Sequence, residues 1–135
     1  METSHTLAPA LGNPEIDSDH ANFEQLLHQV LEASNAEFPA LFRQLADEVK
    51  AHFERENQLM EESQYPAIAE HRGEHRRVLG DFEQFLTRLD RGRINFCRAY
   101  AMETLPGWFS LHVTTMDAAL VQHLKVYSDI VHEAS

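Results

Sequence analysis

Histidine and carboxylate side chains recur in this chain at spacings that place them on one face of a helix. His52 and Glu56 are four residues apart, and so are His71 and His75. Residues four apart lie about one turn from each other on the same helix face. Each pair can therefore point at one spot. Imidazole and carboxylate groups bind divalent metal ions, so the two pairs are candidate metal ligands.

Two further histidines lie in phase with apolar residues. His20 precedes Phe23 by three residues, and His112 follows Trp108 by four. A single buried histidine is more often a hydrogen-bonded core residue than a ligand. Five of them with an in-phase glutamate are costly to bury, because imidazoles have too few acceptors to satisfy one another. A bound metal cluster would satisfy all of them, which makes a metal site the favoured interpretation.

Asp117 does not fit this pattern on a regular helix. It follows His112 by five residues, which is about 500° of rotation and leaves the two side chains about 140° apart. Either the helix is distorted there, for example by a π-bulge, or Asp117 approaches the site from its flank.

The donor types limit the metal without identifying it. Imidazole and carboxylate ligands without thiolate suit Fe, Mn, Cu, Ni or Zn. The single cysteine, Cys97, excludes a cysteine-rich zinc site and is interpreted as a small buried residue. Seven protein ligands exceed the needs of one ion, so two ions are expected, with carboxylates able to bridge them. The candidate ligands are His20, His52, Glu56, His71, His75, His112 and Asp117.

Apolar residues at helical spacing predict four helices that carry these groups. Asp17 or Ser18 is predicted to cap the first, which ends before Pro39. The second covers about 40–62, and the third runs from about 67 to the turn at 90–92. The fourth extends from about 96 to 131, with a kink or interruption expected at 106–107.

Short loops between four amphipathic helices predict an all-α, antiparallel up-down-up-down four-helix bundle. We expect residues 1–14 to form an N-terminal arm and residues 15–135 to form the bundle domain. The length of 135 residues is enough for one domain with a substantial core.

The charge of the chain limits the kinds of partner that it can bind. Lys and Arg total 11 against 22 Asp and Glu, a formal net charge of −11. A chain this acidic, with no basic cluster in its sequence, is a poor candidate for binding nucleic acid or an anionic membrane. It has no apolar run long enough to span a bilayer and no signal-peptide pattern, so we expect a cytoplasmic protein.

The candidate residues fall into motifs that resemble those of the hemerythrin family, and the bacterial members most. The similarity covers residues 15–120. The family's patterns I-D-x-x-H, H-F-x-x-E, Y-P, H-x-x-x-H and W-x-x-x-H-x-x-x-x-D are matched here by Ile16–His20, His52–Glu56, Tyr65–Pro66, His71–His75 and Trp108–Asp117.

The resemblance implies a non-haem di-iron centre that binds O2 reversibly. It implies that one iron is held by His71, His75 and His112. It implies that the other is held by His20 and His52, with a position left open for O2. Glu56 and Asp117 would bridge the two irons, together with an oxo or hydroxo group. The five-residue spacing that excludes Asp117 on a regular helix is the family's own spacing.

Three aromatic residues are candidates for an O2 pocket, because they are the apolar residues nearest the ligands in sequence: Phe53, Trp108 and Phe109. Ordinary core packing is the alternative for each. Phe109 departs from the family, in which an aliphatic residue is common beside the tryptophan. Its larger ring could narrow the pocket or change the rate of autoxidation. His123 lies close to the face of His112 and is a lesser candidate for a residue around the site.

The resemblance therefore favours an O2-binding protein, for storage, delivery or scavenging, over an enzyme. O2 delivery would involve an oxygen-using enzyme as partner. Two alternatives remain open: a sensor of O2 or redox state that acts through a separate signalling partner, and a di-iron peroxidase or nitric-oxide-handling enzyme.

Overall fold

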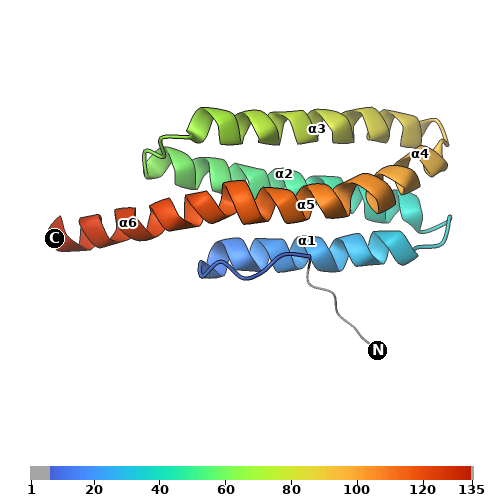
Figure 1. The fold of residues 1–135 in the computed structure, drawn as a ribbon. Helices are drawn as coiled ribbons and strands as arrows, with labels where there is room; N and C mark the ends of the chain where they lie inside the picture. The colour runs from blue at the N-terminus through green and yellow to red at the C-terminus, as the bar shows by residue number, and fades with distance from the viewer. Residues whose placement is uncertain (1–6, 135) are drawn as a thin grey trace.

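The computed structural model describes residues 7–134, which form four consecutive helical stretches and no strand. The first three are α1 (Pro14–Glu32), α2 (Phe38–Glu62) and α3 (Ile68–Asp90). The fourth is continuous but irregular, and comprises α4 (Ile94–Ala99), η1 (Tyr100–Thr104), α5 (Leu105–His112), η2 (Val113–Asp117) and α6 (Ala118–Ala134). Successive stretches run in opposite directions (Figure 1), which confirms the predicted bundle. None of the described helices is long and apolar enough to cross a membrane.

The interior of the bundle consists of two apolar clusters. The larger contains the buried rings of Phe38, Phe42 and Phe82, and the smaller consists of Ile16, Met60, Leu120 and Val121. On every helical stretch the candidate ligands fall between a residue of one cluster and a residue of the other. On α1, for example, His20 lies between Ile16 and Phe23. The ligands therefore form a polar layer across an otherwise apolar core.

The first helix begins earlier than the sequence pattern predicts. Asn13 is its N-cap, and the side chain of Asn13 accepts a hydrogen bond from the backbone N–H of Ile16 at 3.0 Å. The prediction of Asp17 or Ser18 as the cap is wrong. Asp17 instead accepts the backbone N–H groups of Leu11 and Gly12 at 2.7 and 3.0 Å. An acidic residue in the first turn is also favoured by the helix dipole.

The described part of the N-terminal segment packs against the bundle. Ala8 is buried in the larger cluster, and Leu11 packs against both clusters. The backbone N–H of Leu7 donates to the carboxylate of Glu24. Gly12 has a φ of 94°, which glycine adopts more readily than other residues, and the chain turns there into α1. Residues 1–6, including His5 of the predicted arm, lie outside the described residues.

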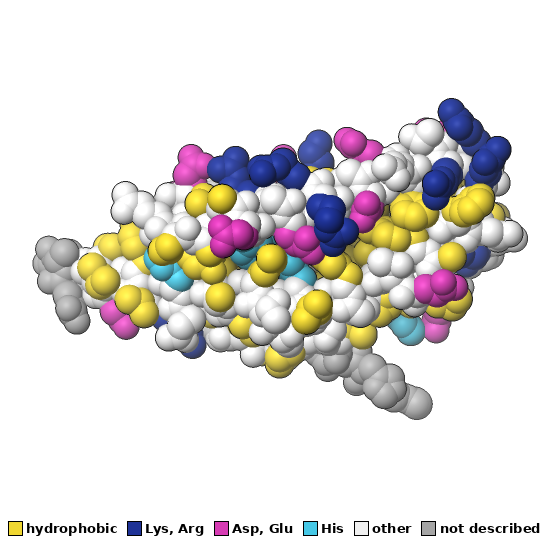
Figure 2. Space-filling view, turned by 45° about the horizontal axis from the view of Figure 1, so that its top comes forward, with side chains coloured by type: hydrophobic (Ala, Val, Ile, Leu, Met, Phe, Trp, Pro, Cys, Tyr) yellow, Lys and Arg dark blue, Asp and Glu magenta, His cyan; other side chains and the backbone are white. Residues whose placement is uncertain are grey.

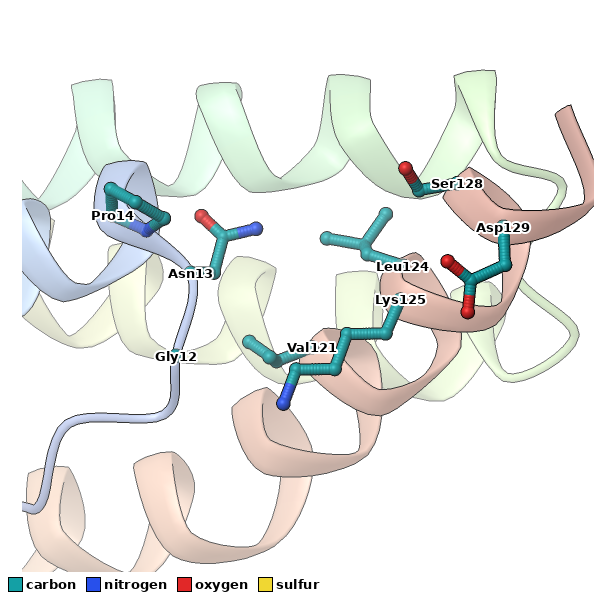
Figure 3. A pocket seen from close by; sticks show the side chains of 8 residues that line it. All are labelled: Gly12, Asn13, Pro14, Val121, Leu124, Lys125, Ser128 and Asp129. Carbon is teal, nitrogen blue, oxygen red and sulfur yellow. The ribbon is translucent and has the colours of Figure 1, made fainter. Parts of the chain in front are cut away.

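A pocket of about 330 Å³ lies where this turn meets α6 (Figure 3). Its lining residues are Gly12, Asn13, Pro14, Val121, Leu124, Lys125, Ser128 and Asp129. None of the candidate metal ligands lines it. The pocket is therefore separate from the polar layer.

The interruption expected near Pro106 is confirmed, and it lies just before the proline. In η1 the hydrogen bonds are spaced five residues apart, and the N–H of Leu105 donates to the carbonyl of Tyr100. Proline has no N–H and clashes with the preceding turn of a regular helix. The wider turn lets the chain continue through Pro106, and the helical path bends in this region (Figure 1).

Basic side chains gather on α3 and at its end (Figure 2). The sequence pattern had not indicated a basic cluster. Six of the 11 Lys and Arg residues lie between residues 72 and 93. Five carboxylates between residues 70 and 93 offset them. Arg77, for example, pairs with both Glu74 and Asp81. The surface of α3 is therefore mixed in charge rather than strongly basic.

The N-cap can be tested by replacing Asn13 with alanine. We expect Asn13→Ala to lower the free energy of unfolding by about 1 kcal/mol, because the first turn of α1 loses the acceptor for the N–H of Ile16. Urea unfolding followed by circular dichroism measures this change. Gln29→Ala, at an exposed position in the same helix, is the matched control. Equal stability of the two variants would contradict the assignment of the cap.

Candidate metal centre

The seven candidate ligands come together in the polar layer, and all seven are buried. Each helical stretch contributes to the group. α1 provides His20, α2 provides His52 and Glu56, α3 provides His71 and His75, and the fourth stretch provides His112 and Asp117. The two carboxylates, Glu56 and Asp117, are 0% exposed and lie among the five imidazoles.

The two oxygens of Glu56 face different histidines. Oε1 lies 3.1 Å from His75 Nε2 and 3.4 Å from His71 Nε2. Oε2 lies 2.9 Å from His52 Nε2 and 3.8 Å from His20 Nε2. The carboxylate of Glu56 therefore joins a pair of histidines on α3 to a pair on α1 and α2.

Asp117 divides its oxygens in the same way. Oδ1 lies 3.0 Å from His71 Nε2 and 3.2 Å from His112 Nε2, whereas Oδ2 lies 2.8 Å from His20 Nε2. Two groups result, and within each the donor atoms lie within 4.8 Å of one another. The three-histidine group is Glu56, His71, His75, His112 and Asp117, and the two-histidine group is His20, His52, Glu56 and Asp117.

Asp117 reaches the cluster because the helix is distorted before it. The η2 segment follows His112 directly, and the N–H of Ala118 donates to the carbonyl of Val113 five residues back. The hydroxyls of Thr114 and Thr115 donate to backbone carbonyls one turn earlier, at 2.8 and 2.6 Å. A π-turn brings residues five apart closer to one face. Of the two explanations left open by the sequence, the distorted helix is correct.

Buried atoms without hydrogen-bond partners show that the residues suit a cation. Eight buried side-chain nitrogen and oxygen atoms in this region have no hydrogen-bond partner. Seven of the eight belong to residues of the three-histidine group, and five of these seven are the atoms through which its members face one another: Glu56 Oε1, His71 Nε2, His75 Nε2, His112 Nε2 and Asp117 Oδ1. Burying such atoms unpaired is costly, and metal coordination would remove that cost.

The electrostatics also favour positive charge at this centre. Burial opposes ionisation of both carboxylates, but the histidines that surround them lower the pKa of Glu56 and of Asp117 below their ordinary values. Burial likewise opposes the charged imidazolium, yet Asp117 and Glu56 raise the pKa of both His20 and His71 to about 9. The lowered pKa values of the two carboxylates and the raised pKa values of His20 and His71 both indicate that the cluster attracts positive charge, whether as protons or as a metal ion.

Comparison with known proteins shows the family of this chain. The family model described as the Hemerythrin HHE cation binding domain matches residues 11–124, most of the chain. The chain belongs to the hemerythrin family. A bacteriohemerythrin from Ralstonia nicotianae is 34% identical to it over 114 residues, which cover 84% of this chain and 82% of that protein. No solved structure matches the chain significantly. The resemblance inferred from the sequence motifs is thus confirmed.

In this hemerythrin domain, Asn57 orients one of the histidines, and the sequence pattern did not reveal it. Nδ1 of His75 lies 2.8 Å from the side-chain oxygen of Asn57. An amide oxygen can only accept, so Nδ1 donates and Nε2 keeps its lone pair for the interior of the cluster. Such outer contacts set the tautomer and ring orientation of metal-bound histidines. In the sequence, only the position of Asn57 directly after Glu56 could have indicated this role.

A half-buried ion pair beside the cluster was also missed. Arg55 donates two hydrogen bonds to Asp19, at 2.9 and 2.5 Å. Asp19 precedes His20 and Arg55 precedes Glu56, so the pair joins α1 to α2 next to a residue of the cluster on each helix. Asp19 is only 6% exposed, and a buried aspartate without such a partner would be costly.

The predicted aromatic residues lie against the histidines of the cluster. Phe53 stacks on His75 with ring centroids 3.9 Å apart and an interplanar angle of 8°. The edge of Phe109 meets His20, with centroids 5.5 Å apart. Phe23, which the sequence pattern placed only in the core, stacks on Phe109 at 4.4 Å. These rings form an apolar wall around the polar cluster.

His123 lies outside the cluster. Its Nε2 donates to the backbone carbonyl of Ser63 at 2.9 Å, and its ring lies 5.0 Å from that of Tyr65. Tyr65 in turn lies 6.4 Å from His71, measured between ring centroids. His123 therefore reaches the cluster only through another side chain.

The role of Asn57 predicts a change in metal affinity. We expect Asn57→Ala to weaken metal binding by about 10- to 100-fold, because the ring of His75 loses the contact that orients it. Competition with a coloured chelator measures the affinity. Gln58→Ala, at the next and exposed position of α2, is the matched control. An unchanged affinity in Asn57→Ala would show that His75 needs no such support.

Proposed function

We propose that this hemerythrin domain binds O2 reversibly at two iron ions held in the polar layer. The observation that supports it best is the unequal division of histidines around two shared carboxylates. The three-histidine group offers five donor residues and the two-histidine group offers four. Six-coordinate iron at each position would leave room for an additional ligand on the two-histidine side.

The residues of the cluster have distinct tasks in this proposal. His71, His75 and His112 would hold one iron, and His20 and His52 the other. Glu56 and Asp117 would bridge the ions, each with one oxygen toward either side. An oxo or hydroxo group would be the third bridge. The iron pair, when bound, supplies the electrons that O2 takes up on binding and returns on release.

The protein's own contribution is to exclude water and restrict access. Phe109 lies against His20, on the side where the donor set is smaller, and Phe23 stacks behind it. Both rings are 1% exposed. An apolar wall of this kind favours a small uncharged ligand over water and ions. It also protects a reactive centre from side reactions with solvent.

The balance of ligands favours reversible binding over enzymatic turnover. Di-iron sites of ferritin-like bundles use Glu-x-x-His pairs and are rich in carboxylates. Here five histidines accompany two carboxylates, so fewer anionic ligands stabilise iron in high oxidation states. On this basis we propose O2 storage, delivery or scavenging as the role.

One set of measurements on the purified protein tests the proposal. We expect about two irons per chain, together with visible absorption bands that appear with O2 and disappear when O2 is removed. Metal analysis and anaerobic spectroscopy provide both results. One metal ion per chain, zinc in place of iron, or peroxidase turnover faster than reversible oxygenation would contradict the proposed function.

Replacing a single histidine tests the ligand assignment. We expect His75→Ala to lose iron, because the three-histidine group then has two imidazoles left. His28→Ala is the matched control, since the side chain of His28 is 70% exposed and lies outside the cluster. Iron content per chain is the measurement. Full iron content in His75→Ala would refute the assignment.

Phe109 provides a test of the pocket that leaves the ligands intact. We expect Phe109→Leu to retain iron but to change the lifetime of the O2-bound form, because a smaller side chain then lies against His20. The decay of the O2-dependent absorption measures that lifetime. An identical decay in Phe109→Leu and in the unmodified protein would show that Phe109 does not line the candidate O2 pocket.

A further inference from the structure

A hydrogen bond between α3 and α5 closes one side of the cluster. The indole Nε1–H of Trp108 donates to Oε2 of Glu74 at 2.8 Å. Glu74 directly precedes His75, and Trp108 lies one turn before His112. The bond therefore joins the helix that carries two histidines of the three-histidine group to the helix that carries the third.

The carboxylate of Glu74 is itself held in place. Arg77 donates to both of its oxygens, each at 2.9 Å, and also donates to Asp81 at 3.2 Å. An arginine with two parallel bonds to one carboxylate restricts its orientation. The acceptor for the indole is thus fixed along α3 rather than free to rotate.

Trp108 connects this surface arrangement to the interior. Its ring stacks on that of His112, with centroids 5.1 Å apart and an interplanar angle of 25°. It also meets Phe53 and Phe23 edge-on, at 6.1 and 6.4 Å between centroids. Trp108 is only partly buried, whereas His112 and both phenylalanines are buried. The indole therefore separates the apolar wall and His112 from solvent.

We propose that Glu74 is a positioning residue, which holds Trp108 against His112 and thereby keeps water out of the candidate O2 pocket beside the cluster. A tryptophan at this depth could otherwise adopt several orientations, and a rotated indole would expose both His112 and Phe53. Because the bond is made to the polar edge of the ring, it fixes orientation rather than adding apolar burial. The consequence for O2 rests on the proposed function, but the position of the indole does not.

Fluorescence of Trp108 provides a direct test, since it is the only tryptophan in the chain. The full chain is measured metal-free and after addition of Zn²⁺, with circular dichroism as a check of helix content. We expect Glu74→Ala to shift the emission to longer wavelength and to raise the acrylamide quenching constant. Glu74→Gln retains an acceptor oxygen and should remain close to the unmodified protein.

Two control variants separate this role from general effects of surface charge. Glu70→Ala removes an exposed carboxylate one turn earlier on α3, and Arg76→Ala removes an exposed arginine of α3 while leaving Glu74 and Arg77 in place. We expect both to keep the emission and quenching of the unmodified protein. A Glu74→Ala protein with unchanged emission and quenching would overturn the proposal. So would the same red shift and quenching in either control variant.

A double-mutant cycle tests whether Glu74 acts through the indole. Trp108→Phe keeps an aromatic ring but has no N–H, so it removes the same bond from the other side. We expect Glu74→Ala, Trp108→Phe and the double variant to shorten the lifetime of the O2-bound form by the same several-fold factor. Multiplied effects in the double variant would mean that the residues act independently, and would overturn the proposal.

The two proposals fail in different ways. A chain that binds fewer than two irons, or shows no O2-dependent absorption, refutes the proposed function. The fluorescence comparison still decides the role of Glu74 in that case, because it requires neither iron nor O2.

Discussion

The structure depends on the burial of two ionised carboxylates in the middle of a helical bundle. Glu56 and Asp117 have no exposed surface, and an isolated carboxylate in such a place costs several kcal/mol. Five imidazoles surround them, yet the imidazoles leave atoms unpaired themselves. A positive metal ion at the centre would resolve both problems together. The same groups determine the packing of four helices and the donor set of the site, so metal binding would be coupled to folding.

The backbone brings two residues of the cluster onto one helix face in two ways, one with a regular helix and one with a distorted helix. On α2 and α3 the normal helical period already places two residues on one face, as His52 with Glu56 and His71 with His75. The last helical stretch instead contributes residues five apart, and it does so by a π-turn between His112 and Asp117. Such turns are rare in proteins overall, but those that occur are often found at functional sites. The aromatic wall then isolates the cluster, and the hydrogen bonds that Asn57 accepts from His75 and Glu74 accepts from Trp108 orient the residues around it.

Most of the fold and the membership of the cluster could be predicted from the sequence. Helical spacing and short loops were sufficient for the bundle, and the in-phase positions of five histidines and Glu56 for six of the seven members of the cluster. Asp117 was not predictable from spacing, because the distortion depends on the whole helix; family resemblance identified it. The cap of α1 was missed because Asn13, Asp17 and Ser18 are all good caps, and only packing of the preceding residues selects one. Asn57 and Glu74 resemble surface residues in sequence, since their partners are distant along the chain.

The π-turn of η2 also determines how the rest of the last helix is aligned. A π-turn is equivalent to one residue inserted into a regular α-helix, and one residue corresponds to about 100° of rotation. If this segment adopted a regular α-helical turn with no residue removed, every later side chain would turn by about that angle relative to the bundle. Leu120 and Val121, which are buried in the smaller apolar cluster, would then leave it together with Asp117. Deleting one residue from Val113–Met116 would instead convert the π-turn into a regular turn and keep the later side chains on the same face. The alignment of the last helix with the bundle therefore depends on the extra residue being absorbed within this one turn.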